Sequence, residues 1–195
     1  MLLMLDKKDL ETIKRGIDAI EKERDTVIRT SRDVVKLSKK VIYALHRNDT
    51  ASAGKAVAEM DKVFKALSAS AKSPKILSSG SYKVAVQEYV EAFCFYELMK
   101  NNRIPANSKL KLDPEFYLMG LIDLTGELVR KAINSAIKGD YKTSVRLKEL
   151  VSELYDELLL FDFAGGELRK KFDSVKYDLK KLDDLVLSLK LSEKI

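Results

Sequence analysis

The chain has 195 residues, of which 46% are hydrophobic, and it carries a formal net charge of +6. Its single cysteine, Cys94, excludes an internal disulfide and a cysteine-rich zinc site. Only three prolines and eight glycines interrupt the chain, which argues against a β-sandwich or barrel and favours long helices.

The opening segment, MLLML, is too short for the apolar region of a signal peptide, and no apolar run reaches membrane-spanning length. We therefore expect a soluble, cytoplasmic protein that contacts no membrane. The excess of basic residues favours an anionic partner, and the distribution of those charges matters more than their sum.

The first element is a helix from Asp6 to about His46, predicted from apolar residues at alternating spacings of three and four. Forty residues at 1.5 Å each give a rod of about 60 Å. Polar residues at a few positions of this seam suit a bundle or an oligomer interface better than a free coiled coil. They are Arg24, Ser31 and Ser38.

Basic residues follow the second half of the same helix at spacings of three and four, with Lys39 beside them and Asp33 as the one acidic neighbour. We call this set the basic stripe: Arg29, Arg32, Lys36 and Lys40. Charges repeated over several turns are typical of a surface that binds nucleic-acid phosphates. A solvated helix face is the alternative explanation.

Five more helices follow, separated by turn signals and by two irregular segments, 72–80 and 101–113. They are expected over Thr50 to Ala71, between the two irregular segments with Val84 to Met99 inside it, from Pro114 to near Gly139, over Tyr141 to Leu160, and over Leu168 to Val186. With no convincing strand, the sequence predicts an all-α bundle of six or seven helices in one domain, residues 1–195.

Two of these helices place carboxylates on otherwise apolar faces. Glu88 and Glu91 are three residues apart in the third helix, and Asp123 and Glu127 are four apart in the fourth. Each pair shares a helix face. Because an unpaired buried carboxylate is costly, such groups require a cation, hydrogen bonds or a raised pKa.

Four such acids on neighbouring helices could hold Mg²⁺ or Mn²⁺, which take oxygen ligands. A bound metal could polarise a phosphodiester and activate water. Gly120 and Gly126, in the same helix as the second pair, would let a neighbour approach closely. The alternative is that Glu127 pairs with Arg130, that Glu88 and Glu91 meet lysines, and that no metal binds.

Other chemistries find little support in the chain. With one histidine and one cysteine, nucleophilic triads and zinc hydrolysis are excluded. His46 lies at a predicted helix end, where a capping role is expected. No glycine-rich phosphate loop is present.

Three segments resemble the translin and translin-associated factor X family. They are QEYVEAFCFYELM at 87–99, YLMGLIDLTGELVRKAINSA at 117–136 followed by GDY at 139–141, and LRKKFDSVKYDLKKLDDLV at 168–186. They occur in the family's order and at its separations, so the resemblance covers nearly the whole chain.

The resemblance implies a seven-helix bundle that assembles into a closed hollow oligomer, commonly an octamer, enclosing RNA or DNA. Translin is regarded as the non-catalytic partner, whereas factor X carries an acidic site for Mg²⁺-dependent endoribonuclease activity. That site has a Glu pair spaced by three and an Asp and Glu spaced by four, which match Glu88, Glu91, Asp123 and Glu127. The chain is shorter than eukaryotic factor X, which favours a homo-oligomer.

Three hypotheses follow. The first is a Mg²⁺-dependent endoribonuclease whose four acids hold the metal and whose basic stripe holds RNA phosphates. The second is a non-catalytic shell that binds single-stranded RNA or DNA, with the acids in a hydrogen-bonded network. The third is a helical scaffold in which the basic stripe only confers solubility.

Overall fold

The structure is a computed structural model that describes residues 6–195, so the opening MLLML lies outside it. Over the described residues the chain forms eight helices and no strand, which confirms the all-α prediction. The helices are α1 (Lys7–His46), α2 (Thr50–Ser70), α3 (Pro74–Leu77), α4 (Gly80–Asn101), α5 (Asn107–Leu110), α6 (Pro114–Ile137), α7 (Tyr141–Leu159) and α8 (Gly166–Leu191).

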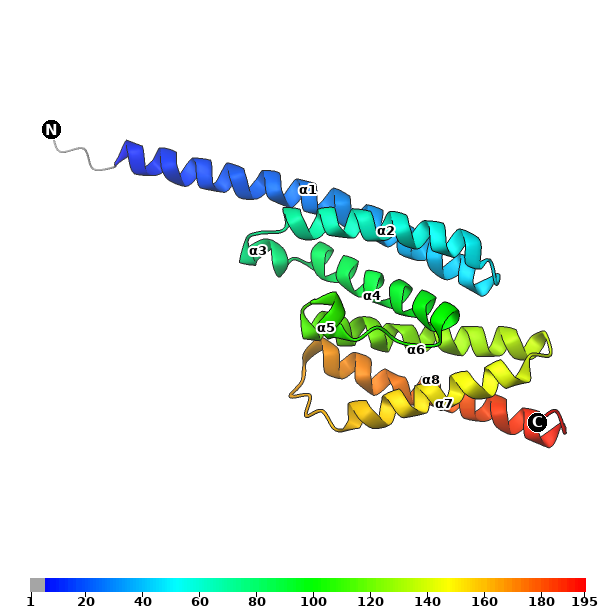
Figure 1. Cartoon of the computed structure of the whole chain (residues 1–195). Coiled ribbons are helices and arrows are strands. Elements are labelled where there is room, and N and C mark those ends of the chain that lie inside the picture. Colours follow the sequence, from blue (N-terminus) through cyan, green and yellow to red (C-terminus); the bar gives the residue numbers. More distant parts are fainter. Residues whose placement is uncertain (1–5) are drawn as a thin grey trace.

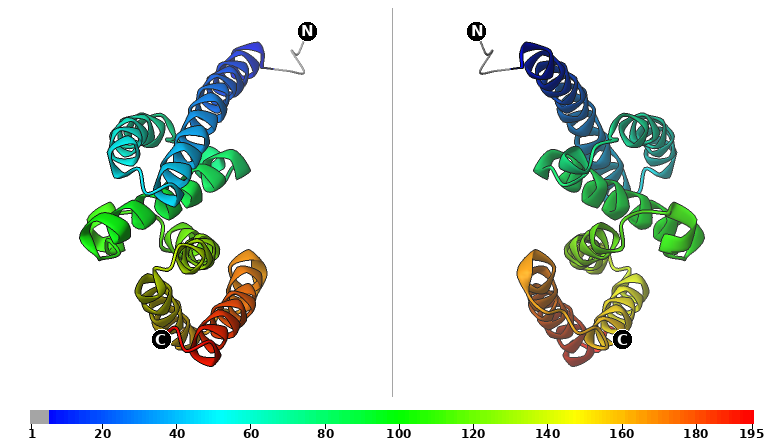
Figure 2. Two further views of the ribbon diagram at one scale, coloured as in Figure 1. Left: turned by 90° about the vertical axis from the view of Figure 1, so that its right-hand side faces the viewer. Right: turned by 90° about the vertical axis from the view of Figure 1, so that its left-hand side faces the viewer.

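The long helices are stacked in layers (Figure 1). Helix α1 packs against α2 and α4, α4 packs against α6, and α6 packs against both α7 and α8. Viewed along the helices, α7 and α8 form an open V beneath α6 (Figure 2). Helices α4 and α6, which carry the four acids, therefore lie at the centre of the molecule.

Helix α1 begins directly after a capping residue, Asp6. The Asp6 carboxylate accepts hydrogen bonds from the backbone N–H groups of Lys8 (2.9 Å) and Asp9 (3.2 Å). The second half of α1 buries Val34 and Val41 against the body, whereas the first half extends beyond it (Figure 1). The apolar seam of α1 is thus covered along only part of its length.

Helix α6 begins and ends at the residues that the sequence marks. The Asp113 carboxylate accepts from the N–H groups of Glu115 and Phe116, and Pro114 occupies the first turn. Beyond the last residue of α6, Gly139 adopts a φ of +82°, a conformation that favours glycine.

Helices α4 and α6 approach each other closely at Gly120. A Cβ built there would lie 2.6 Å from Val90 Cβ and 2.7 Å from the Gln87 carbonyl oxygen. Only glycine allows this packing, as the sequence predicts. The same expectation for Gly126 is wrong, because a Cβ there would meet nothing closer than an Asp178 oxygen at 4.0 Å.

The structure differs from the predicted elements mainly in short helices and in helix ends. The one-turn helices α3 and α5 lie inside the two segments expected to be irregular, and α8 extends beyond both of its predicted ends. Cys94 is a buried free thiol. Among the described residues, no helix is both long and apolar enough to cross a membrane.

Candidate metal and nucleic-acid site

The four acids predicted from spacing lie on the packed helices α4 and α6, near enough for their charges to act on Glu91. Glu91 is largely buried, and burial is the main reason that its pKa rises to about 8. The negative charges of Glu88, Asp123 and Glu127 raise it further. All four carboxylates therefore belong to one electrostatic unit, which we call the acid cluster.

Two acids of the cluster hold a partner from α1. The Ser38 hydroxyl donates to Glu88 Oε2 at 2.7 Å, and His46 Nε2 contacts Glu127 Oε2. Arg130 also lies near Glu127, with Nη1 3.7 Å from Oε2, which bears out the pairing considered as the alternative for this residue. Helix α1 thus forms a third wall of the site.

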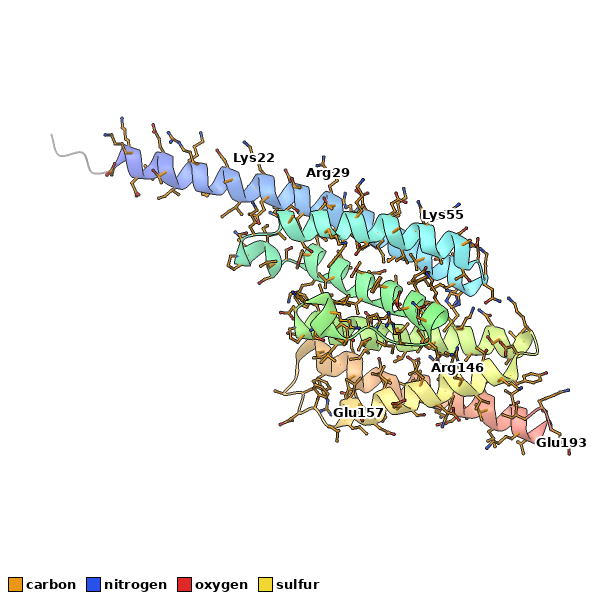
Figure 3. All side chains as sticks on the ribbon, viewed as in Figure 1. Lys22, Arg29, Lys55, Arg146, Glu157 and Glu193 are labelled. Carbon is orange, nitrogen blue, oxygen red and sulfur yellow. The ribbon has the colours of Figure 1, made fainter. Side chains whose placement is uncertain are left out.

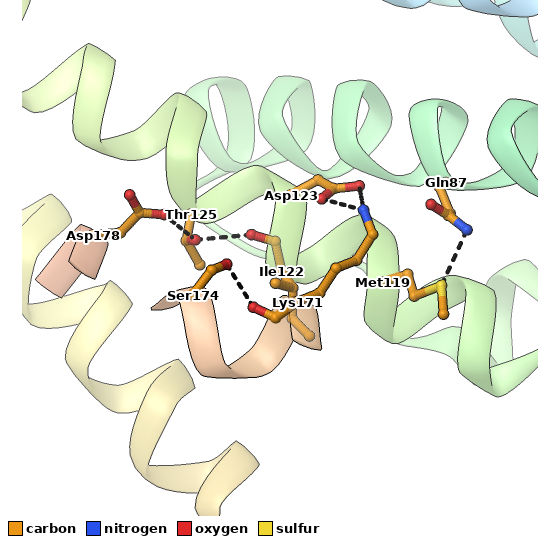
Figure 4. A network of polar contacts seen from close by, with 8 residues as sticks. All are labelled: Gln87, Met119, Ile122, Asp123, Thr125, Lys171, Ser174 and Asp178. Atoms are coloured by element: carbon orange, nitrogen blue, oxygen red, sulfur yellow. Dashed lines mark hydrogen bonds and ion pairs between the residues drawn. The ribbon is translucent and has the colours of Figure 1, made fainter. Parts of the chain in front are cut away.

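Asp123 is held from the other side by α8. Lys171 Nζ lies 2.5 Å from both carboxylate oxygens of Asp123, as Figure 4 shows. Nearby, the hydroxyl of Thr125 donates to Asp178 Oδ2 at 2.9 Å, a second polar contact between α6 and α8 (Figure 4). Helix α8 therefore supplies a cation to the acid cluster.

The donor set fits an oxygen-seeking divalent cation in its chemistry. Carboxylates are the ligands that Mg²⁺ and Mn²⁺ prefer, and water completes their coordination. Over residues 6–195, however, no three Asp, Glu, His or Cys side chains are gathered as ligands around a single point. Instead, three of the acids contact protein groups, namely Ser38, His46 and Lys171.

His46 is not the capping residue that its position at the end of α1 suggests. Its ring is buried, tilted against Phe95 with ring centroids 5.4 Å apart, and Nδ1 has no hydrogen-bond partner among the described residues. With Nε2 bonded to Glu127, the ring orients that carboxylate. His46 is therefore part of the acid site, a role that its sequence position did not reveal.

A groove of about 600 Å³ runs between α1 and the first turn of α4, where the basic stripe was predicted. The members of the stripe that line it are Arg32 and Lys36, joined by Lys39. Its floor is apolar, and Val84 is half exposed in it. We call this feature the basic groove; its lining is Ile28, Ser31, Arg32, Val35, Lys36, Lys39, Gly80, Ser81 and Val84.

The basic groove leads toward the acid cluster. Ser31 in its lining precedes Ser38 by seven residues, about 10 Å along α1, and Ser38 bonds to Glu88. Arg29 and Lys40, the remaining members of the stripe, are exposed but do not line the groove. Figure 3 shows Arg29 projecting outward from α1, away from the body of the molecule.

Sequence reasoning found the acids but not the residues that hold them. Ser38 stood out only as a polar residue on an apolar seam, and Lys171 only as one of several basic residues in the last helix. Each lies about fifty residues from its partner in the chain. Such pairs follow from the packing of α1 and α8 against the α4–α6 centre.

The fold and site define a class of protein: an all-helical bundle with a central acid cluster beside a basic groove. The translin family model matches residues 22–193, so the chain belongs to the translin family.

Curated relatives carry both of the family's names. The chain is 26% identical to translin-associated protein X of Mus musculus, in a match that covers 93% of this chain and 77% of that protein. It is 39% identical to translin of Gallus gallus over 80 residues, which is 41% of this chain and 35% of that protein. The match to chicken translin is thus confined to about a third of its length.

Solved structures share the fold over nearly the whole chain. Apo-NeC3PO superposes with a TM-score of 0.86 at 32% identity, covering 94% of this chain and 97% of that chain. AfC3PO in a complex with duplex RNA gives a TM-score of 0.81 at 22% identity, with the same coverage of both chains. The second likeness establishes the fold alone.

Proposed function

We propose that this protein is a metal-dependent endoribonuclease that binds RNA inside a homo-oligomeric shell. Glu88, Glu91, Asp123 and Glu127 would hold Mg²⁺, or Mn²⁺ in its place. Arg32, Lys36 and Lys39 of the basic groove would hold RNA phosphates, with Arg29 and Lys40 extending that surface.

The observation that carries this proposal is that the charges of three acids act on the fourth. Two packed, largely apolar helices place Glu88, Asp123 and Glu127 near enough to raise the pKa of Glu91, although like charges in a partly buried site destabilise one another. A protein that needed only stability would gain from apolar residues at these positions. Acids at such positions are expected where they bind a cation.

When bound, the metal would polarise the phosphodiester and lower the pKa of an attacking water. The chain's own residues would prepare the site for it. Ser38 and His46 fix Glu88 and Glu127 through one oxygen each, since both contacts are made to Oε2. The two other oxygens, Glu88 Oε1 and Glu127 Oε1, accept no hydrogen bond from the described residues, so they would be the available ligand atoms.

The basic groove would bring the substrate to these acids. Basic residues that repeat along one helix can contact successive phosphates of a nucleic-acid strand. Such contacts orient the strand and contribute most of the salt-sensitive affinity. A strand lying in the groove would pass from Arg32 toward Ser38 and the acid cluster. The RNA held by AfC3PO, a protein of the same fold, supports RNA as the substrate class.

An oligomer would enclose this surface, with an octamer as the assembly expected from the family resemblance. The part of α1 that extends beyond the body exposes Leu10, Ile13 and Ile17 by about half each, at spacings of three and four. Such a stripe is typical of helix–helix contact between subunits. The location that we propose for this assembly is the cytoplasm.

A second candidate function is a non-catalytic shell that binds single-stranded RNA or DNA. One observation favours it: three of the four acids already hold a protein partner, as a structural network would. This shell would show salt-sensitive binding without metal-dependent products.

The experiment is cleavage of a labelled single-stranded RNA by the purified protein, with Mg²⁺ or with EDTA. Asp123→Asn is expected to lower the cleavage rate by at least about 100-fold, because a ligand charge is lost. Asp184→Asn, an exposed acid of α8, is the matched control and should cleave normally. Binding without cleavage by the unmodified protein would favour the shell.

Replacing Arg32, Lys36 and Lys39 by glutamine tests the basic groove separately. RNA affinity should fall and depend less steeply on salt, because about three phosphate contacts are removed. Unchanged affinity and salt dependence would favour the scaffold hypothesis.

A further inference from the structure

Lys171 differs from the other partners of the acid cluster in what it covers. Ser38 and His46 each contact one oxygen of a glutamate, whereas the Lys171 ammonium lies against both oxygens of Asp123. The pair is partly buried, with the lysine and aspartate side chains 24% and 32% exposed. Figure 4 shows the lysine reaching from α8 across to α6.

The positive charge of Lys171 acts on Glu91 as well as on Asp123. It opposes the rise in the pKa of Glu91 that burial and the other carboxylates produce. Lysine suits such a place, because its ammonium is a compact charge with three donors on a flexible stem. It supplies at Asp123 the charge that a divalent cation would otherwise supply.

We infer that Lys171 is a built-in counter-ion of the acid cluster, which competes with the divalent cation for Asp123. This inference rests on the proposed function. With Lys171 in place, the metal-free cluster is partly neutralised, and the described residues present no three-ligand arrangement. A metal that uses Asp123 must first displace the lysine, so Lys171 sets the metal concentration at which the site fills.

A purely structural ion pair is the competing explanation, and the packing of α8 argues against it. Helix α8 buries Phe172, Val175 and Leu182, and the bond from Thr125 to Asp178 also ties it to α6. These contacts hold α8 in place without the lysine. Lys171→Met keeps a long unbranched side chain, so the variant is expected to fold.

The test is isothermal titration calorimetry, in which Mn²⁺ is titrated into the purified protein. Lys171→Met should bind Mn²⁺ about tenfold more tightly or better, because a competing charge within a few ångströms is removed. Lys171→Arg keeps the charge and should bind no more tightly than the unmodified protein. The added change Asp123→Asn should abolish the gain in Lys171→Met, since the competition occurs at that carboxylate.

Lys181→Met is the matched control. Lys181 also lies on α8 and pairs with an aspartate, at 3.0 Å from Asp178 Oδ1, but it is 58% exposed and contacts no acid of the cluster. The control removes the same charge and should leave the affinity for Mn²⁺ unchanged. Equal tightening in both variants would mean that net charge alone acts, which overturns the inference.

Thermal unfolding gives a second readout. In EDTA, Lys171→Met should unfold at a lower temperature than the unmodified protein, because the acids lose their counter-ion, and Mn²⁺ should restore more stability to the variant. Unchanged or weaker Mn²⁺ binding by Lys171→Met would overturn the inference. If the unmodified protein still cleaves RNA with Mg²⁺, the inference fails alone; if it neither binds Mn²⁺ nor cleaves, the proposed function fails as well.

Discussion

Glu91 is the residue on which the electrostatics of the site converge. Its pKa of about 8 lies well above that of a free glutamate, because burial and three nearby carboxylates disfavour its charged form. The folded protein therefore keeps the proton over a range of pH where the unfolded chain has released it. A cation that relieves this repulsion would displace the proton.

This shift predicts a pH dependence of stability in EDTA. Below the unfolded pKa of about 4.5 both states are protonated, and the folded state loses relative stability as pH rises from there to about 8. Glu91→Gln removes the ionisation. We therefore expect the unfolding temperature of the variant to rise relative to that of the unmodified protein as the pH increases from about 5 to about 9. Circular dichroism measures both unfolding temperatures. A constant difference would contradict the assigned environment of Glu91.

At the scale of elements, the closeness of α4 and α6 sets the geometry of the acid cluster. Gly120 permits that approach. It lies where the turns of α4 that carry Glu88 and Glu91 face the turn of α6 that carries Asp123. The backbone of α4 is one of the groups that a Cβ would meet, and backbone yields less readily than a flexible side chain.

Gly120→Ala is accordingly expected to destabilise the fold by about 1–3 kcal/mol and to reduce cleavage. Gly126→Ala is the matched variant on the same helix. It has room for the methyl group, so it should gain up to about 1 kcal/mol from the helix preference of alanine. Urea unfolding measures both, and equal effects of the two substitutions would contradict the close contact at Gly120.

The sequence predicted these elements well where local signals are strong. The apolar periodicity located α1, and Asp113 with Pro114 marked the start of α6, because capping and proline geometry are local. Helices α3 and α5 have four residues each and were missed, since one turn carries no periodicity. The spacing of the acids predicted the shared faces, but Ser38, His46 and Lys171 meet them only through tertiary packing.

At the scale of the whole molecule, the first half of α1 leaves an apolar stripe exposed. Its exposed apolar stripe is covered by no other described helix, and the body of the molecule begins only farther along α1 (Figure 1). Assembly through this stripe would bury it and would bring several basic grooves into one particle.

Ile13→Asp is expected to lower the mass of the assembly, because a charge would enter an apolar subunit contact. Arg15→Gln, outside the apolar stripe on the same helix, changes the net charge by the same amount and should leave the mass unchanged. Size-exclusion chromatography with light scattering measures both. An unmodified protein that runs as a monomer would exclude the shell.

The most direct test of the central claim, that the acid cluster is a metal-dependent catalytic site, is single-turnover cleavage of RNA already bound to the protein. The unmodified protein and Glu91→Gln are compared with Mg²⁺ and with EDTA, at matched occupancy. We expect cleavage only by the unmodified protein with Mg²⁺, and equal RNA binding by both. Cleavage that persists in Glu91→Gln or in EDTA would contradict the claim and place the chemistry elsewhere.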